Sequence, residues 1–239
     1  AASGYVSHHG GTSKVSTLPG PWSYSSLKKF KTCPKQFYEV KVAKNFVEPE
    51  STEATRYGKS FHLAAEEYVR DGTPLPEYFK FAKDALNNLN QIAGEKFCEY
   101  KMGITVGLEP CGFNDERVWY RGIADLLIIN REKGEARVVD YKTGKSAKYA
   151  DPDQLELMSL CVFKHFPEIK KVKAGLLFVL ANAFPKAQFD LKDEVQWNKW
   201  KHKHQRLQAA YDNDMWNPKP SGLCKAWCPV LSCSHNGRA

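Results

Sequence analysis

Hydrophobic side chains recur every three to four positions between residues 23 and 93, a spacing that predicts amphipathic helices. The pattern covers residues 23–42, 56–70 and 76–93. Ser23 provides a side chain that can cap the first of these helices. The sequence Asp71-Gly72-Thr73-Pro74 ends the second helix, because glycine and proline break helical structure. The N-terminal part of the chain is therefore predicted to be helical.

Beyond residue 93 the apolar pattern changes to the period of β-strands. Residues 97–108, 118–130 and 136–143 are predicted as three successive strands. The order of helices, β-meander, helix, strand and helix predicts an α/β fold with a central mixed sheet flanked by helices. The later elements are predicted as a helix over 153–166, an almost continuous apolar strand over 172–180 and a long polar helix over 194–212.

The chain has 239 residues, of which 42% are hydrophobic, and this content is enough for the core of one domain. We expect a single domain over 21–239, with its core at about 56–213 and a cysteine-rich tail, 217–239, docked beside Cys33. Residues 1–20 are rich in Gly, Ser and His. They lack an apolar centre, so we expect a disordered leader or a remnant of expression rather than a secretion signal.

No stretch of the sequence approaches the ~18 uninterrupted apolar residues that a membrane span needs. Seven cysteines are an odd number, and without a secretion signal they do not indicate a disulfide framework. We therefore expect an intracellular protein with no membrane partner. Its compartment would be the cytoplasm of a bacterium or of a phage-infected cell, or an organelle.

The formal net charge of +8 suits a polyanionic partner such as nucleic acid, although a well-solvated surface could carry the same charge. Lysines cluster at 28–35, and a second basic stretch covers 199–206. Aromatic side chains near these stretches could stack on the bases of a single strand. Their helical spacing fits burial in the core equally well. These aromatic residues are Trp22, Tyr24, Phe30, Phe37, Trp197 and Trp200.

Two aspartates are predicted to face each other across a β-hairpin. If residues 131–134 form the turn, counting back along the antiparallel pair places Asp125 directly opposite Asp140. Lys142 lies two positions after Asp140, so the two side chains project from the same face of the strand. Carboxylates at this distance repel unless a cation lies between them. Hard oxygen ligands favour Mg²⁺ or Mn²⁺, which outlines the site of a metal-dependent phosphodiesterase.

Four short motifs, in this order, resemble those of the PD-(D/E)XK nuclease superfamily, and within it the RecB-type exonuclease branch. A lone Asp-x-Lys occurs often by chance, whereas four ordered motifs in compatible settings are far more specific. The resemblance implies a PD-(D/E)XK core with an N-terminal helical segment. The motifs are Gly58-Lys59-Ser60-Phe61-His62, Gly122-Ile123-Ala124-Asp125, Asp140-Tyr141-Lys142-Thr143-Gly144 and Gln154-Leu155.

The resemblance implies a set of ligands for Mg²⁺ or Mn²⁺. Asp125 and Asp140 would be the carboxylate ligands, together with the backbone carbonyl of Tyr141. His62 would be the extra ligand that is typical of the RecB-type branch. Glu99 stands at a place where many relatives have an acidic residue and would be a further candidate, near the site or at a second ion.

The resemblance also implies two residues that act beside the metal. Lys142 would orient or deprotonate the attacking water and stabilise charge on the phosphorus. Gln154 would contact the substrate or Lys142 from the helix that flanks the sheet. Relatives often have a tyrosine four residues after this glutamine, and here the position is Met158.

Three cysteines within ten residues of the tail, Cys224, Cys228 and Cys233, predict a metal site. A local fourth ligand, His235, would complete a Cys₃His zinc knuckle. A remote one, Cys33, would complete a Cys₄ iron–sulfur site. The other cysteines are scattered and are interpreted as core or inert residues; they are Cys98, Cys111 and Cys161.

The arrangement with Cys33 resembles AddB-type and CRISPR-associated nucleases, in which one cysteine before the core joins three after it around a [4Fe–4S] cluster. Those relatives leave two and then five residues between the last three cysteines, whereas this chain leaves three and then four. An iron–sulfur cluster, zinc and empty thiols therefore all stay open. A staple of this kind would link the two ends of the chain and supply folding energy.

These observations together predict a divalent-metal-dependent DNA exonuclease that acts on single strands or DNA ends in recombination, repair or DNA processing. The sequence has no Walker-type loop, so a helicase or recombination protein is a candidate partner. Two alternatives are a non-catalytic nucleic-acid-binding module with a structural metal and a site-specific endonuclease on the same fold.

Overall fold

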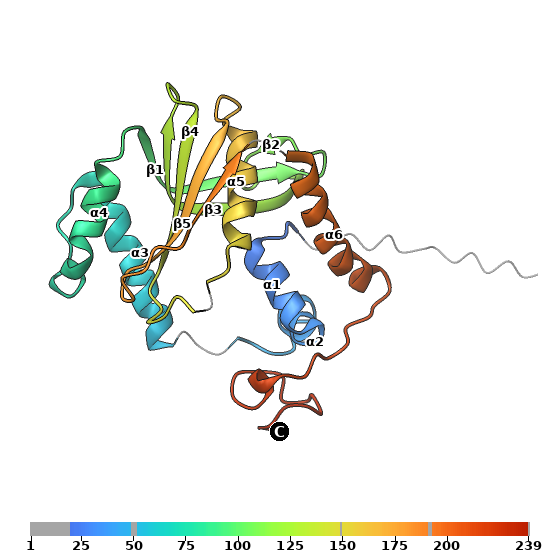
Figure 1. The fold of residues 1–239 in the computed structure, drawn as a ribbon. Helices are drawn as coiled ribbons and strands as arrows, with labels where there is room; N and C mark the ends of the chain where they lie inside the picture. The colour runs from blue at the N-terminus through green and yellow to red at the C-terminus, as the bar shows by residue number, and fades with distance from the viewer. Residues whose placement is uncertain (1–19, 49–51, 149, 191–192, 239) are drawn as a thin grey trace, which may run out of the picture.

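The computed structural model describes residues 20–48, 52–148, 150–190 and 193–238. It has one β-sheet with helices on both faces, and the C-terminal tail lies below the first helices in the view of Figure 1. The predicted leader, 1–20, lies outside the described residues except for its last position.

The sheet has six strands in the order β2-β1-β3-β4-β5-β6. Strands β4 and β5 are parallel and are joined through a helix, while all other neighbours are antiparallel, so the sheet is mixed. The strands are β1 (Glu95–Thr105), β2 (Pro110–Cys111), β3 (Val118–Asn130), β4 (Glu135–Lys142), β5 (Lys171–Phe178) and β6 (Lys186–Asp190).

Each face of the sheet has its own hydrophobic cluster. One face packs against α3 (Glu53–Asp71), the 3₁₀ helix η2 (Glu77–Ala82) and α4 (Lys83–Asn90). The other packs against α5 (Asp153–His165), with α1 (Tyr24–Thr32) and α6 (Asp193–Asp212) beyond it. Helix α5 buries eight of its side chains because it is covered by the sheet and by these outer elements. The predicted α/β fold, with a mixed sheet flanked by helices, is confirmed.

The predicted register of the hairpin is confirmed. Asn130 pairs with Glu135, and the ladder between β3 and β4 continues to the pair of Leu126 and Val139. The next positions along the two strands are Asp125 and Asp140. The two aspartates therefore lie at the end of this antiparallel ladder, where β4 continues beside β5.

The prediction of one helix over 23–42 was wrong. Helix α1 ends at Thr32, and α2 (Pro34–Phe37) and the π-helix η1 (Tyr38–Val42) follow as separate elements. Proline disfavours helical geometry at the preceding residue, so Cys33 adopts an extended conformation, with φ −159° and ψ 108°. Pro34 then starts α2, where its missing N–H costs nothing. Cys33 thus lies at a corner of the chain.

Other boundaries also moved. The predicted helix over 76–93 begins as the 3₁₀ helix η2 and becomes α-helical at Lys83. Strand β6 was not predicted, because Lys186–Asp190 is a mostly polar edge segment whose alternate residues are exposed. Strand β2 was not predicted either, since two residues carry no periodic pattern.

The aromatic residues near the basic stretches are mainly core residues, as one of the two interpretations held. Trp22, Phe30, Phe37, Trp197 and Trp200 are all buried, whereas Tyr24 is half-buried. They cannot offer their faces to nucleic-acid bases in this structure, apart from Tyr24. Among the described helices, none has the length and apolar character to cross a membrane.

Candidate metal and catalytic site

Helix α3 passes close to the C-terminal end of β4. Gly58 makes this approach possible, since a Cβ at this position would lie 3.1 Å from the side-chain oxygen of Thr143. One helical turn later, His62 lies beside the ends of β3 and β4. The glycine and histidine of this motif therefore position one side chain against the strands.

His62 uses both ring nitrogens at the site. Its Nε2 lies 3.1 Å from the backbone carbonyl oxygen of Tyr141. Its Nδ1 lies 3.3 Å from Oδ1 of Asp125 and 3.9 Å from Oε1 of Glu99. One ligand atom from each of the three side chains lies within 4.8 Å of the other two, so His62, Glu99 and Asp125 can hold a metal ion together.

Asp125 is buried, and the backbone of the neighbouring strand fixes its orientation. Its Oδ2 accepts a hydrogen bond of 2.7 Å from the backbone N–H of Tyr141. Because this oxygen is occupied, Oδ1 is the atom that faces His62. The strand β4 thereby supplies both the N–H that fixes one ligand and the carbonyl that faces another.

Glu99 reaches the site through an irregular point in β1. The flanking residues Cys98 and Tyr100 pair with Leu126 and Ala124 of β3, which places Glu99 opposite Asp125. The backbone of Glu99 has φ 50°, a left-handed conformation that is strained for a residue with a side chain. Such strain in the middle of a strand is a local cost that brings a carboxylate close to Asp125.

Asp140, Lys142 and Gln154 form a second group beside the first. Lys142 Nζ lies 2.7 Å from Oδ2 of Asp140 and donates a hydrogen bond of 3.1 Å to Oε1 of Gln154. The amide nitrogen of Gln154 in turn donates to Oδ1 of Asp140 at 3.0 Å. Each of the three side chains thus contacts the other two, which fixes the lysine at the end of β4.

The electrostatics of the site favour a bound cation. Burial, followed by the negative charge of Asp125, raises the pKa of Asp140 to about 6 and the pKa of Glu99 to about 7. Burial lowers the pKa of His62, but the hydrogen bond and charge of Asp125 outweigh this and raise it. Clustered carboxylates gain stability when a divalent ion takes the place of protons.

The donor set also fits a hard divalent ion. Carboxylate oxygens with one imidazole suit Mg²⁺ or Mn²⁺ better than a soft, thiolate-seeking metal. Oδ2 of Asp140 is buried and accepts no hydrogen bond from the described residues, although the charge of Lys142 lies beside it. A buried carboxylate oxygen in this state has capacity left for a ligand.

The structure brings the predicted residues together, but in two groups. His62, Glu99 and Asp125 converge, and the carbonyl of Tyr141 faces His62. Asp140, expected beside Asp125, turns towards Lys142 and Gln154. Glu99, named above only as a further candidate, belongs to the converging group, and its signal in the sequence was its place opposite Asp125 in the β-meander.

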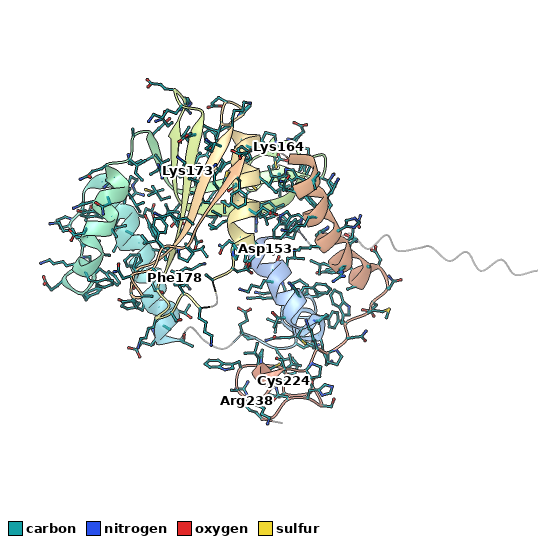
Figure 2. The ribbon with its side chains drawn as sticks, in the orientation of Figure 1. Asp153, Lys164, Lys173, Phe178, Cys224 and Arg238 are labelled. Carbon is teal, nitrogen blue, oxygen red and sulfur yellow. The ribbon has the colours of Figure 1, made fainter. Side chains whose placement is uncertain are left out.

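The four cysteines singled out in the sequence line one small cavity, together with His235. Figure 2 shows Cys224 in the tail, below the helices that Cys33 separates. The backbone N–H of Lys219 donates to Sγ of Cys33, and that of Ser221 donates to Sγ of Cys224, both at 3.4 Å. Both candidate fourth ligands line this cavity, but among the described residues the one group of three whose ligand atoms lie within 4.8 Å of one another is His62, Glu99 and Asp125.

The remaining cysteines lie apart from this cavity. Burial raises the pKa of the thiols of Cys98, Cys111 and Cys161, which favours the unreactive protonated form. Burial likewise raises the pKa of Cys228 in the tail cavity, where the other three cysteines add to the effect. A metal ion would reverse that effect, because it stabilises thiolates.

The family model of the PD-(D/E)XK nuclease superfamily matches this chain over residues 21–233. Among solved structures, a "Putative exonuclease" from Eubacterium rectale is similar, with 13% sequence identity, a TM-score of 0.50 and 86% of each chain covered. The protein SSO0001 also matches, with 13% identity and a TM-score of 0.45 over 93% of this chain and 90% of its own. The likeness to the first of these concerns the fold alone. No curated protein matches the chain.

Proposed function

Because this chain belongs to the PD-(D/E)XK nuclease superfamily, it is a nuclease, and we propose that it is a divalent-metal-dependent DNA exonuclease of the RecB-type branch. The observation that carries the proposal is the pair of adjoining groups at the end of β3 and β4. One group, His62, Glu99 and Asp125, can hold a cation. The other holds a lysine against Asp140.

The metal ligands in this proposal are His62, Asp125 and Asp140, with Glu99 and the backbone carbonyl of Tyr141. A bound Mg²⁺ or Mn²⁺ would lower the pKa of a water molecule and shield the charge of the phosphate. The hydrogen bond from the Tyr141 N–H keeps the Asp125 carboxylate directed at this position. The backbone carbonyl of Tyr141 holds the His62 ring from its other nitrogen.

Lys142 and Gln154 would serve the phosphate and the attacking water. The ammonium of Lys142 forms an ion pair with Asp140 and donates one hydrogen bond to the amide oxygen of Gln154, so it has donor capacity left for a phosphate. Gln154 contacts both Asp140 and Lys142, so it would position the lysine rather than react itself. Lys142 would orient the water, and a donor fixed in this way stabilises the charge that develops on the phosphoryl oxygens.

The cavity of Cys33, Cys224, Cys228 and Cys233 would hold a [4Fe–4S] cluster, with zinc bound through His235 as the alternative. Its role would be structural, because it joins the segment before the core to the tail after it. We include in the proposal a single domain over 21–239. We also include a role in recombination, repair or DNA processing inside the cell, with a helicase or recombination protein as partner.

The test is cleavage of linear and circular DNA, each single- and double-stranded, with 5′ or 3′ labels and with Mg²⁺, Mn²⁺ or EDTA. The proposal expects metal-dependent degradation of linear substrates that spares circles. Lys142→Ala should abolish it, while Lys133→Ala, an exposed lysine in the turn between β3 and β4, should not. Cleavage of circles would replace the exonuclease with an endonuclease. Salt-sensitive binding without cleavage would favour a binding module.

A further inference from the structure

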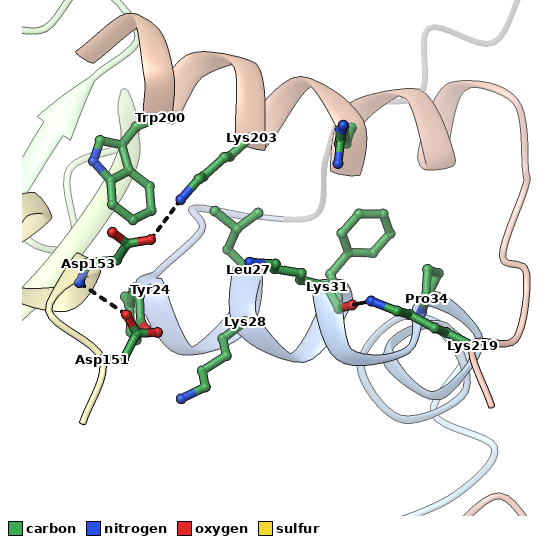
Figure 3. A pocket seen from close by; sticks show the side chains of 12 residues that line it. Tyr24, Leu27, Lys28, Lys31, Pro34, Asp151, Asp153, Trp200, Lys203 and Lys219 are labelled. Atoms are coloured by element: carbon green, nitrogen blue, oxygen red, sulfur yellow. Dashed lines mark hydrogen bonds and ion pairs between the residues drawn. The ribbon is translucent and has the colours of Figure 1, made fainter. Parts of the chain in front are cut away.

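A groove of about 430 Å³ lies between α1 and α6, next to the first turn of α5. Figure 3 shows α6 above the groove and α1 below it, with Asp151 and Asp153 at one end. The volume is in the range of pockets that bind small organic molecules. No residue assigned above to the metal or the lysine group lines it.

The base of the groove is apolar and aromatic. Leu27 and Phe30 of α1 and Trp200 of α6 contribute buried side chains, and the half-buried ring of Tyr24 lies at the end nearest α5. The hydroxyl of Tyr24 donates to Asp151, which ties α1 to the segment before α5. The partly exposed ring of Tyr24 is the aromatic surface of this groove that can contact the face of an unpaired base.

The rim of the groove is basic. Lys28 and Lys31 project from α1, Arg206 projects from α6, and Lys219 reaches in from the segment before the tail. Among the described residues, no carboxylate lies within ion-pair distance of Lys28, Lys31 or Arg206. Like charges gathered without partners around a concave surface attract an anion.

The two acidic residues of the groove are already engaged at its inner end. Asp151 accepts hydrogen bonds from the Tyr24 hydroxyl and from the backbone N–H of Asp153, the latter at 3.1 Å. Asp153 pairs with Lys203 at 2.9 Å and with Lys199 at 3.4 Å. The charge that remains uncompensated is therefore positive and lies along the outer rim.

The groove adjoins the catalytic group through the start of α5. Asp153 lines the groove, and the next residue, Gln154, bonds Asp140 and Lys142. Consecutive Cα atoms are about 3.8 Å apart, so adjacent residues of α5 belong to the groove and to the lysine group.

We propose that this groove binds one nucleotide of a single-stranded substrate next to the scissile phosphate, with its base against Tyr24 and Leu27 and its phosphate on Lys28 and Arg206. The ligand class is a nucleotide because the groove combines an apolar base with a cationic rim. It is unpaired because a duplex presents only the edges of its stacked bases. The inference rests on the proposed function, and it names the substrate of that same site as single-stranded DNA.

The test measures binding of a fluorescent single-stranded oligonucleotide in EDTA, so that cleavage does not contribute. Lys28→Ala/Arg206→Ala should raise Kd about 10-fold or more and should reduce the slope of log Kd against log salt by about 0.7, since the two side chains hold one phosphate and each neutralised phosphate contributes about 0.7. The matched control is Lys29→Ala/Lys201→Ala, which removes two neighbouring cations that do not line the groove. It should leave Kd within about twofold.

A cross-linking experiment locates the base. An oligonucleotide carrying 5-iodouracil should cross-link to the peptide that contains Tyr24, and excess unlabelled single strand should compete. Equal weakening by both double variants, or cross-links confined to other segments, would overturn the inference. Duplex binding as tight as single-strand binding, or a mononucleotide that binds as tightly as the oligonucleotide, would also overturn it; the latter would make the groove a product site.

The binding and cleavage assays distinguish a wrong groove assignment from a wrong proposed function. If the chain cleaves single strands but Lys28→Ala/Arg206→Ala binds and cleaves as the control does, the groove assignment alone is wrong. If no variant and no substrate shows cleavage while the groove variant still weakens binding, the proposed exonuclease is wrong and the groove remains a nucleotide site.

Discussion

Lys142 Nζ lies 2.7 Å from Oδ2 of Asp140, on the same strand and two residues away. The pair forms because alternate residues of a strand project from one face, and Gln154 fixes it by bonding both partners. The lysine is held at 35% exposure of its side chain, against 16% for the aspartate. Its ammonium is therefore accessible to a substrate at one side while the carboxylate stays mostly covered.

Replacing this lysine should separate chemistry from folding. We expect Lys142→Ala to lower the cleavage rate by at least about 10²-fold, the range for loss of one fixed donor. Thermal unfolding should change little, because the side chain is partly exposed. Mn²⁺ affinity, measured by calorimetry, should persist. A rate within about threefold of the wild type would remove Lys142 from the site.

The strained backbone of Glu99 gives a stability prediction that is independent of activity. Glu99→Gly should be more stable than Glu99→Ala by roughly 1 kcal/mol, because glycine tolerates φ 50° and alanine does not. Urea unfolding of the two variants measures the difference. Both lose the carboxylate, so both should bind Mn²⁺ more weakly than the wild type. Alanine proving the more stable of the two would contradict a left-handed Glu99.

The buried imidazole of His204 predicts a pH dependence of stability. Burial between Trp22 and Trp119 lowers its pKa from 6.5 to about 4. Between pH 6.5 and 4, His204 therefore binds a proton in the unfolded chain but not in the folded chain. Stability is fully present above pH 6.5, and it falls as the pH drops through this window.

Substitution of this histidine isolates the effect from other titrating groups. Between pH 7 and pH 5 the wild type should lose on the order of 2 kcal/mol more stability than His204→Phe, which keeps a ring in contact with Trp22 and cannot titrate. Urea unfolding at the two pH values gives the comparison. A parallel loss in both proteins would mean that His204 is protonated in the folded state.

The cysteine cavity gives a prediction that chooses between the two ligand sets. With an iron–sulfur cluster, Cys33→Ser should remove the brown colour and the bound iron and lower the unfolding temperature. With a zinc knuckle, His235→Ala should release zinc while Cys33→Ser leaves it bound. Metal analysis of protein purified without oxygen measures both. Cys98→Ser is the control, since Cys98 lies outside the cavity. Wild-type protein without iron or zinc would mean empty thiols.

Local patterns explain why part of this structure was predictable. The hairpin of β3 and β4 follows from alternation and a short turn, and its register places Asp125 and Asp140 at the end of the same ladder. Gln154 contacts Lys142, which is one of the two contacts expected for it, and both residues belong to motifs with a fixed structural setting.

Other features depend on tertiary structure and left little signal in the sequence. The left-handed turn at Glu99 interrupts an apparently ordinary strand, and β6 is a polar edge segment defined by its pairing with β5. The groove joins α1 to α6, which are more than 150 residues apart in sequence. The break at Cys33 could have been predicted from Pro34.

Lys219 belongs to the walls of two cavities at once. It lines the groove and the cysteine cavity, its backbone N–H donates to Cys33 and its ammonium donates to the carbonyl of Lys31 on α1. An oxidised or emptied cysteine site would therefore disturb the outer end of the groove before it disturbed Lys142. Oxidative damage at the tail would shorten the time that the protein stays on a strand and leave each chemical step intact.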